Sequence, residues 1–238
     1  MAIWNPWRGC HKESEGCLHC YIHRANGKKG IDTDIIYKTD DFYKPIEKDN
    51  KGNYKIKSGQ TVYLCFNSDF LIEEADAWRK EVWDMINIRS DLHFLFLTKR
   101  IERFMISLPD DFVSGYDNVT VCATIENQLR ADQRIPYFKK LPIRHKQITI
   151  QPMLEKINIS DYLDETIECV VVGGESGSNV RPLYYDWVLD IREQCIKNKV
   201  NFEFRQVGSI FMKDGVSYKI AKQYLCSQAR TANINYHV

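Results

Sequence analysis

The chain has 238 residues, 44% of them hydrophobic and 12% aromatic, which is enough to bury the core of one full-sized domain. Its 33 basic and 32 acidic residues leave a net charge of +1, so no global field indicates a nucleic acid, a membrane or an acidic substrate as partner. The sequence has no basic and apolar leader, and no apolar run approaches the ~20 residues of a membrane span. We therefore expect a cytoplasmic protein without membrane contact.

The first element is a cysteine loop over residues 10–21, whose C-x6-C-x2-C array consists of Cys10, Cys17 and Cys20. Three thiols this close together indicate a metal, and three thiolates on a cubane iron–sulfur cluster leave one iron free to bind a small molecule. Zinc is the alternative, because His23 would complete a Cys3His set and His11 and His19 are further candidate ligands. The other cysteines lie in apolar strand-like or helical patterns typical of buried thiols: Cys65, Cys122, Cys169, Cys195 and Cys226.

A polar, lysine-rich insertion follows over residues 26–60, with a strand near residues 35–38 and a hairpin-tip signal at residues 48–54. Short apolar strands are then predicted at residues 61–66, 93–97, 118–123, 147–150, 168–172 and 201–205. Amphipathic helices are predicted at residues 73–88 and 187–199. This alternation predicts an α/β fold, a parallel (βα) barrel that is complete or partial (TIM-like), as a single domain over residues 1–238. A doubly wound open sheet is the alternative.

In either architecture ligands bind at the carboxyl ends of the strands, so the residues after each apolar run are candidates for a site. The polar and glycine residues at these positions are Ser68, Asp69, Lys99, Arg100, Glu126, Asn127, Gly173, Gly174, Glu175 and Arg181. Glycines let backbone amides approach a ligand, and the three basic side chains could anchor a carboxylate or phosphate. The alternative interpretation is a solvated rim with a glycine turn and charged helix starts. No catalytic triad is evident.

These motifs resemble, nearly end to end, a family of phage- and plasmid-associated proteins described by their three-cysteine motif. The segments that carry the resemblance are Trp4-Asn-Pro, Gly9-Cys10, Gly16-Cys17-x-x-Cys20-Tyr21, Ser68-Asp69-Phe70, Leu97-Thr-Lys-Arg100, Thr124-Ile-Glu-Asn-Gln128, Arg134-Ile-Pro136, Gln151-Pro-Met-Leu154, Val171-Val-Gly-Gly-Glu-Ser-Gly177 and Arg181-Pro182. One departure is Gln151, where the family usually has Glu. That family is in turn similar to radical S-adenosylmethionine enzymes of the photoproduct-lyase type, which are partial (βα) barrels. Their usual cluster spacing is C-x3-C-x2-C, whereas the first gap here is six residues.

The resemblance implies a [4Fe–4S] cluster on Cys10, Cys17 and Cys20, whose open iron chelates S-adenosylmethionine. The expected activity is generation of a 5′-deoxyadenosyl radical that modifies a substrate, with a flavodoxin or ferredoxin as electron donor. Strand order assigns the cofactor contacts as follows: Ser68 and Asp69 to the methionine amino group, Lys99 to its carboxylate, Glu126 and Asn127 to the ribose, and the turn Gly173-Gly174-Glu175 to the adenosyl part. Arg100 and Arg181 are candidate substrate contacts.

The identity of the substrate is not readable from the sequence. Phage association makes a nucleotide or a nucleic acid conceivable, although the sequence shows no basic patch with interleaved aromatics to support it. Two other functions stay open. One is a zinc- or cluster-stabilised module that binds nucleic acid or protein without catalysis, and the other is a metal-independent barrel hydrolase.

Overall fold

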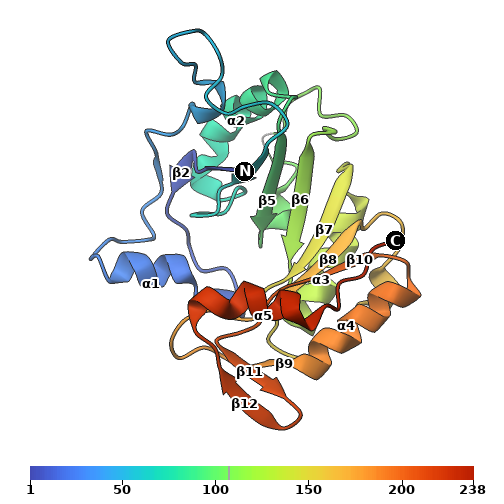
Figure 1. Cartoon of the computed structure of the whole chain (residues 1–238). Coiled ribbons are helices and arrows are strands. Elements are labelled where there is room, and N and C mark those ends of the chain that lie inside the picture. Colours follow the sequence, from blue (N-terminus) through green and yellow to red (C-terminus); the bar gives the residue numbers. More distant parts are fainter. Residues whose placement is uncertain (107) are drawn as a thin grey trace. The chain divides into compact units, whose positions relative to one another are not determined.

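The computed structural model describes residues 1–106 and 108–238, which cluster into two compact units (Figure 1). The first unit comprises Met1–Lys12, Ile22–Cys122 and Lys140–His145, and the second comprises Glu13–Tyr21, Ala123–Lys139 and Lys146–Val238. The single domain expected from the sequence stays a prediction.

Parallel strands form the core of the first unit. They are β1 (Ala2–Trp4), β4 (Thr61–Leu64), β5 (His93–Thr98) and the first part of β6 (Val119–Thr124), in the order β1-β4-β5-β6. The register pairs Ala2 with Val62 and Thr61 with His93. The strands predicted at residues 61–66, 93–97 and 118–123 are confirmed. Strand β1 was not predicted, because three residues are too few to show a periodicity of their own.

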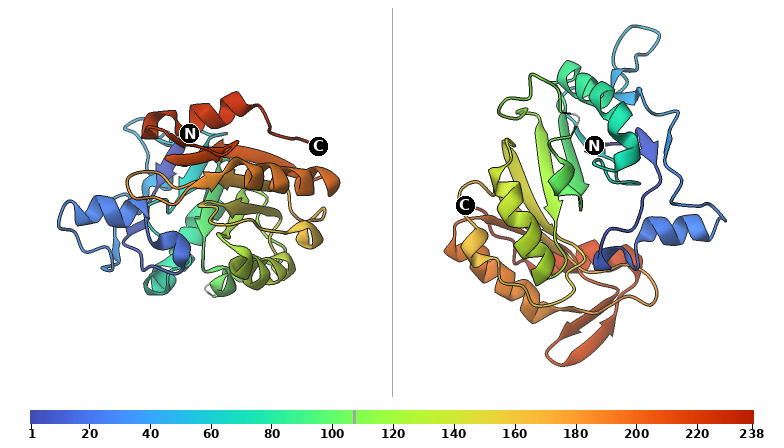
Figure 2. Two further views of the ribbon diagram at one scale, coloured as in Figure 1. Left: turned by 90° about the horizontal axis from the view of Figure 1, so that it is seen from below. Right: turned by 180° about the vertical axis from the view of Figure 1, so that it is seen from behind.

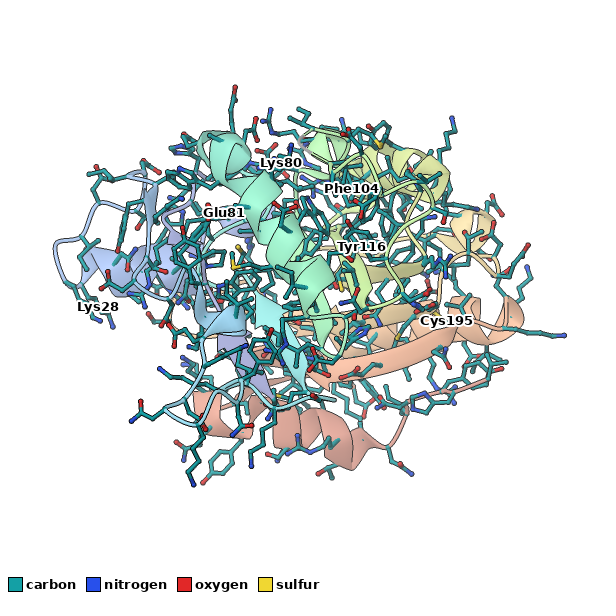
Figure 3. All side chains as sticks on the ribbon, turned by 90° about the horizontal axis from the view of Figure 1, so that it is seen from above. Lys28, Lys80, Glu81, Phe104, Tyr116 and Cys195 are labelled. Carbon is teal, nitrogen blue, oxygen red and sulfur yellow. The ribbon has the colours of Figure 1, made fainter. Side chains whose placement is uncertain are left out.

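Helix α2 (Asp76–Ile88) follows a short 3-10 turn (Glu73–Ala75) and confirms the helix predicted at residues 73–88. Its fully buried Trp83 packs by ring edges against Phe96 of β5, and against Phe104 and Tyr116 beyond that strand. Figure 2 shows α2 in teal beside the green strands, and Figure 3 labels Phe104 and Tyr116 near the helix. Aromatic packing on one helix face therefore fixes α2 to the parallel strands.

The polar insertion is largely irregular, as expected. Helix α1 (Tyr21–Gly27) ends just inside its start. The regular elements of the insertion itself are strand β3 (Tyr37–Lys38), which pairs with β2 (Trp7–Arg8) in antiparallel fashion, and a 3-10 turn (Lys44–Ile46). An isolated antiparallel bridge joins Lys48 and Tyr54, which confirms the predicted hairpin tip. The insertion is held by fully buried Arg89, whose guanidinium donates to the carbonyls of Pro45 and Ile56 and to both carboxylate oxygens of Asp91.

The second unit is also built on parallel strands. They are the end of β6, β7 (His145–Ile150), β8 (Cys169–Gly173) and β10 (Asn201–Gln206), in the order β6-β7-β8-β10. The register pairs Gln147 with Cys169 and Cys169 with Asn201. Helices α3 (Gln128–Lys140) and α4 (Tyr185–Lys197) connect strands, and short 3-10 turns lie at Glu15–Cys17, Ser160–Tyr162 and Lys222–Tyr224. The helix predicted at residues 187–199 is α4, which begins and ends two residues earlier.

A small second sheet, which was not predicted, lies in the C-terminal part of the second unit (Figure 1). It has the order β12-β11-β9 and comprises β9 (Leu183–Tyr184), β11 (Ile210–Lys213) and β12 (Val216–Lys219), with α5 (Leu225–Ala232) following in the chain. The two-residue turn Asp214-Gly215 has φ of 51° and 74°, the positive values that a type I′ hairpin turn requires. The Asp-Gly dipeptide was therefore a readable hairpin signal.

Both units confirm an α/β fold with parallel strands. Among the described residues, no helix combines the length and apolar character needed to cross a membrane. Within each unit, the predicted site residues follow the carboxyl ends of its strands, where ligands of parallel α/β folds bind.

Candidate functional site

The segment around Cys10 is tied to the end of strand β4 within the first unit. The hydroxyl of Ser68 donates to the carbonyl of Gly9, and the amide of Cys10 donates to Thr33 at 2.8 Å. Gly9 has φ of +91°, and a Cβ there would lie 2.2 Å from the carbonyl oxygen of Ile35. Only glycine fits this close approach, so the residue before Cys10 is fixed by backbone sterics. Ser68 thus positions the cysteine segment, and its predicted contact with the cofactor stays a prediction.

Asp69 is the centre of a buried network after β4 and β5. Its carboxylate accepts hydrogen bonds from the Thr98 hydroxyl at 2.7 Å, the Lys99 amide at 3.0 Å and the Arg100 guanidinium at 3.3 Å. Arg100 extends the network to the cysteine segment by donating to the carbonyl of His11 at 3.0 Å. The structure thus brings together Ser68, Asp69, Lys99 and Arg100 from two strand ends. The ammonium of Lys99 has no polar partner among the described residues.

His11 links this segment to acidic side chains of the same unit. Its Nε2 lies 2.5 Å from Glu74 and its Nδ1 lies 3.4 Å from Asp34. The hydrogen bond to Glu74 raises the pKa of His11 above its ordinary value of 6.5. Burial opposes ionisation of Glu74, but the hydrogen bonds from His11 and from backbone, together with the charges of His11 and Arg100, outweigh it and lower the Glu74 pKa. Burial lowers the pKa of His23, and Lys12 and His11 add to this effect. Both partners of the His11–Glu74 pair are therefore favoured in their charged forms.

Cys65 lies directly after β4 with φ of +57° and is fully buried. Burial raises the pKa of its thiol, and the nearby charges of Asp69 and Cys10 raise it further. It is a protonated structural thiol close to Cys10, in agreement with the sequence interpretation. Burial likewise raises the pKa values of Cys169 and Cys195 to about 12.

The part of the cysteine loop that carries Cys17 and Cys20 belongs to the second unit. A 3-10 turn at Glu15–Cys17 begins with Cys17 donating its amide to Ser14, and Cys20 in turn donates to the carbonyl of Cys17. The sulfur of Cys17 accepts the amide of Glu13 at 3.5 Å. Cys10, Cys17 and Cys20 are all half-buried, and none forms a disulfide. Among the described residues, no three His, Cys, Asp or Glu side chains are arranged as a metal site.

Glu126, which follows the end of β6, contacts this loop at Ser14 and Gly16. It is fully buried, with one carboxylate oxygen accepting from the hydroxyl of Ser14 and the other from Arg134 at 2.7 Å. Arg134 also donates to the carbonyl of Thr124 at 2.7 Å. A Cβ on Gly16 would lie 2.5 Å from Glu126, so the loop backbone rests directly on this side chain.

Glu15, two residues before Cys17, is held by two arginines. Arg130 donates to both carboxylate oxygens at 3.2 and 3.3 Å, and Arg181 donates to the Glu15 carbonyl at 3.0 Å. Asn127 contacts the same carboxylate at 3.5 Å and accepts the amide of Arg130 at 2.9 Å. A hydrogen bond to backbone and the contacts from Arg130 lower the pKa of Glu15.

The glycine turn after β8 is filled by protein. A Cβ on Gly174 would lie 2.5 Å from the Cα of Gly208, and one on Gly173 would lie 2.9 Å from Gln151. The side chain of Gln206 donates to the carbonyl of Gly174 at 2.6 Å. Gly174 is thus required for close packing against the Gly208 backbone, whereas Gly173 packs against side chains. Gln151, the position of the departure from the family pattern, lies beside this turn.

Glu175 does not fit the alternative interpretation of the strand ends as a solvated rim. It is 7% exposed and accepts the backbone amide of Arg181 at 2.8 Å and its Nε at 3.3 Å, with a further contact to the guanidinium. The interpretation of Glu175 as a solvent-exposed group is wrong. Its ion pair with Arg181 orients this arginine toward the Glu15 carbonyl, whereas the predicted ligand roles of both residues stay predictions.

Sequence reasoning found the strand-end residues but not their partners. The missed members are Ser14, Glu15, Arg130, Arg134 and the His11–Glu74 pair. Arg134 lies eight residues after Glu126, and this spacing across a helix start was a usable signal. The contacts of Ser14 and Glu15 span more than one hundred residues and left no local signal.

The observations define an α/β protein with parallel strands and a cysteine loop tied to the ends of those strands. Residues 1–232 match the family described as "Protein of unknown function (DUF5131)", and the chain belongs to that family. No curated protein and no solved structure matches the chain.

Proposed function

We propose that this protein is a radical S-adenosylmethionine-like iron–sulfur enzyme with Cys10, Cys17 and Cys20 as cluster ligands. One observation carries the proposal, namely that the cysteine loop is attached at several points to side chains that follow parallel strands. In the first unit, Ser68 and Arg100 hold the backbone beside Cys10. In the second unit, Glu126 and Arg181 hold the loop before Cys17. Ligands of parallel α/β folds bind at this edge of the strands.

The three thiols fit an iron–sulfur cluster in their chemistry. None of them forms a disulfide, and each of the three residues is half-buried. The N–H of Glu13 directed at the sulfur of Cys17 is the kind of hydrogen bond that stabilises a thiolate ligand and tunes a cluster. Three protein thiolates would leave a fourth iron for a small molecule.

With a bound [4Fe–4S] cluster, one electron from a flavodoxin or ferredoxin would cleave the carbon–sulfur bond of S-adenosylmethionine, giving methionine and a 5′-deoxyadenosyl radical that takes hydrogen from the substrate. The chain itself would bind and orient the cofactor. Lys99, whose ammonium is unpaired among the described residues, suits the cofactor carboxylate. Asn127 and Glu126 are proposed for the ribose, Ser68 and Asp69 for the amino group, and the turn at residues 173–177 for the adenosyl part.

The finer statements of fold and setting belong to the same proposal. They are a partial (βα) barrel of the radical S-adenosylmethionine type, a cytoplasmic location, phage association, and a nucleotide or nucleic acid as substrate, with Arg100 and Arg181 as candidate phosphate contacts. Both arginines already bind the cysteine loop through carbonyl groups, so a substrate phosphate would have to share or replace these contacts.

The second candidate function is a zinc- or cluster-stabilised module that binds nucleic acid. A specific observation favours it: residues 205–238 carry five lysines and arginines and one acidic residue. All residues of strand β12 are exposed. Tyr218 on this strand is 46% exposed, and Tyr224, which follows it, is 53% exposed. Lysines interleaved with exposed tyrosines suit a nucleic-acid backbone and its bases, a patch that the sequence pattern alone did not reveal.

Anaerobic reconstitution tests the proposal. We expect about four irons and four sulfides per chain, and cleavage of S-adenosylmethionine to 5′-deoxyadenosine after reduction. Replacing Cys10, Cys17 or Cys20 by Ala should abolish iron loading, whereas Cys169→Ala, at a similarly half-buried thiol, should not. One tightly bound zinc without iron would favour the binding module. Iron content that is equal in all four variants would refute the ligand assignment, and an activity that survives loss of all three cysteines would support the hydrolase.

A further inference from the structure

The cysteine loop is fixed by charged side chains at the residue that precedes Cys17 by two positions. Arg130 reaches both oxygens of the Glu15 carboxylate, and Arg181 reaches the carbonyl of the same residue. A side chain and a backbone group of one residue are thus held from two elements, the start of α3 and the loop after β8. Such two-point contacts restrict both translation and rotation of the loop.

Each arginine is itself oriented by a second group. The buried carboxylate of Glu175 binds the guanidinium and the backbone amide of Arg181. Arg130 is placed by Asn127, which accepts its backbone amide, and by Gln133, which accepts from its guanidinium at 3.0 Å. Both arginines project to the loop that carries two of the three clustered cysteines.

We propose that Arg130 and Arg181, with Glu15 between them, are positioning residues that hold the Cys17–Cys20 loop in one fixed conformation before any metal is present. We call this three-residue set the loop clamp. The inference rests on the proposed function where it concerns iron, but the clamp itself is a property of the metal-free chain. A site that is held in shape in advance loses less conformational entropy when it binds, and it releases its ligand more slowly.

The test measures thiol reactivity in the metal-free protein. Arg130→Met and Arg181→Met should raise the alkylation rates of Cys17 and Cys20 by iodoacetamide about two- to fivefold, the effect of losing a partly exposed charged contact. Buried Cys122 and Cys195 report global opening and should not change. Arg144→Met, which removes an exposed ion pair with Asp117, is the matched control.

Charge reversal separates the clamp from general stability. Glu15→Arg alone should raise the reactivity of both cysteines, and combining it with Arg130→Glu should restore most of the native rate. In reconstituted protein, the clamp variants should lose iron to a chelator severalfold faster and alter the electron paramagnetic resonance spectrum, with Arg130→Lys intermediate.

Unchanged reactivity of Cys17 and Cys20 in both arginine variants would overturn the clamp. A parallel rise at Cys122 and Cys195 would also overturn it, because the effect would then be loss of overall stability. If the unmodified chain binds no iron, the proposed function fails, whereas the alkylation experiment still decides on the clamp.

Discussion

Replacing Glu126 by Gln should destabilise the protein substantially, although it changes one atom. The side chain is fully buried, and its charge is balanced by that of Arg134, which is 5% exposed. Glutamine would leave the arginine charge buried without its counter-ion. Breaking a buried ion pair from one side costs about 3–5 kcal/mol. Because the glutamine amide oxygen can still accept a hydrogen bond from Arg134, we expect a loss of about 3 kcal/mol. For a chain of this size that corresponds to roughly 6–12 °C in Tm.

Urea unfolding followed by circular dichroism measures this loss. Glu193→Gln is the matched control, because its carboxylate is 68% exposed in an ion pair with Arg192 and should change the free energy of unfolding by less than about 0.5 kcal/mol. Combining Glu126→Gln with Arg134→Met should cost about 1–3 kcal/mol less than the sum of the single variants. A loss below about 0.5 kcal/mol for Glu126→Gln would refute the argument from burial.

Three further predictions concern stability. Hydrogen bonds from Arg89 lower the pKa of Asp91 from 3.8 to about 2, so the stability that Asp91 contributes is present above pH 3.8 and lost as the pH falls toward 2. Asp91→Asn, at a side chain one-third exposed, should cost about 1 kcal/mol at pH 7 in urea unfolding, and a difference that does not shrink between pH 4 and 2 would contradict this. Gly174→Ala should cost about 1–3 kcal/mol because its Cβ meets the Gly208 backbone, whereas Gly27→Ala, with nothing within 4 Å, should not destabilise. Glu175→Gln should lower thermal stability through Arg181, and an unchanged Tm would show that the pair contributes little.

The positions of most parallel strands could be predicted because buried parallel strands are continuous apolar runs, as in Val170 to Val172 of β8. Strand β1 could not be predicted in this way, since its three residues are too few to show a hydrophobic periodicity. Helix α3 escaped it because Pro136 and several charges interrupt its apolar face. In both cases tertiary pairing supplies what the local pattern lacks.

The candidate site was predicted by position but not by partner. Strand order correctly placed Glu126 and Glu175 at strand ends, but which group each carboxylate binds depends on where the cysteine loop runs. That path is set by contacts such as Ser14 with Glu126, 112 residues apart. The carboxylates of Asp69, Glu126 and Glu175 all form ion pairs with arginines of the same chain. A sequence shows that such charged residues exist, but not with which groups they pair.

Lys99 is the opposite case, and it gives a prediction in which binding and stability separate. Lys99 is half-buried, and its backbone is held by Asp69 at 3.0 Å, but its ammonium has no polar partner in the described part of the chain. Lys99→Gln should therefore change the free energy of unfolding by no more than about 0.5 kcal/mol. If the ammonium binds the carboxylate of S-adenosylmethionine, its loss should weaken binding by about 1.5–3 kcal/mol, roughly 10- to 150-fold, in calorimetry on reconstituted protein. Lys156→Gln, at a 66% exposed side chain, should alter neither quantity. Glu126→Gln, by contrast, is expected to act mainly on stability. A Lys99→Gln variant with lowered stability but unchanged affinity for S-adenosylmethionine would show that Lys99 is structural and does not belong to the site.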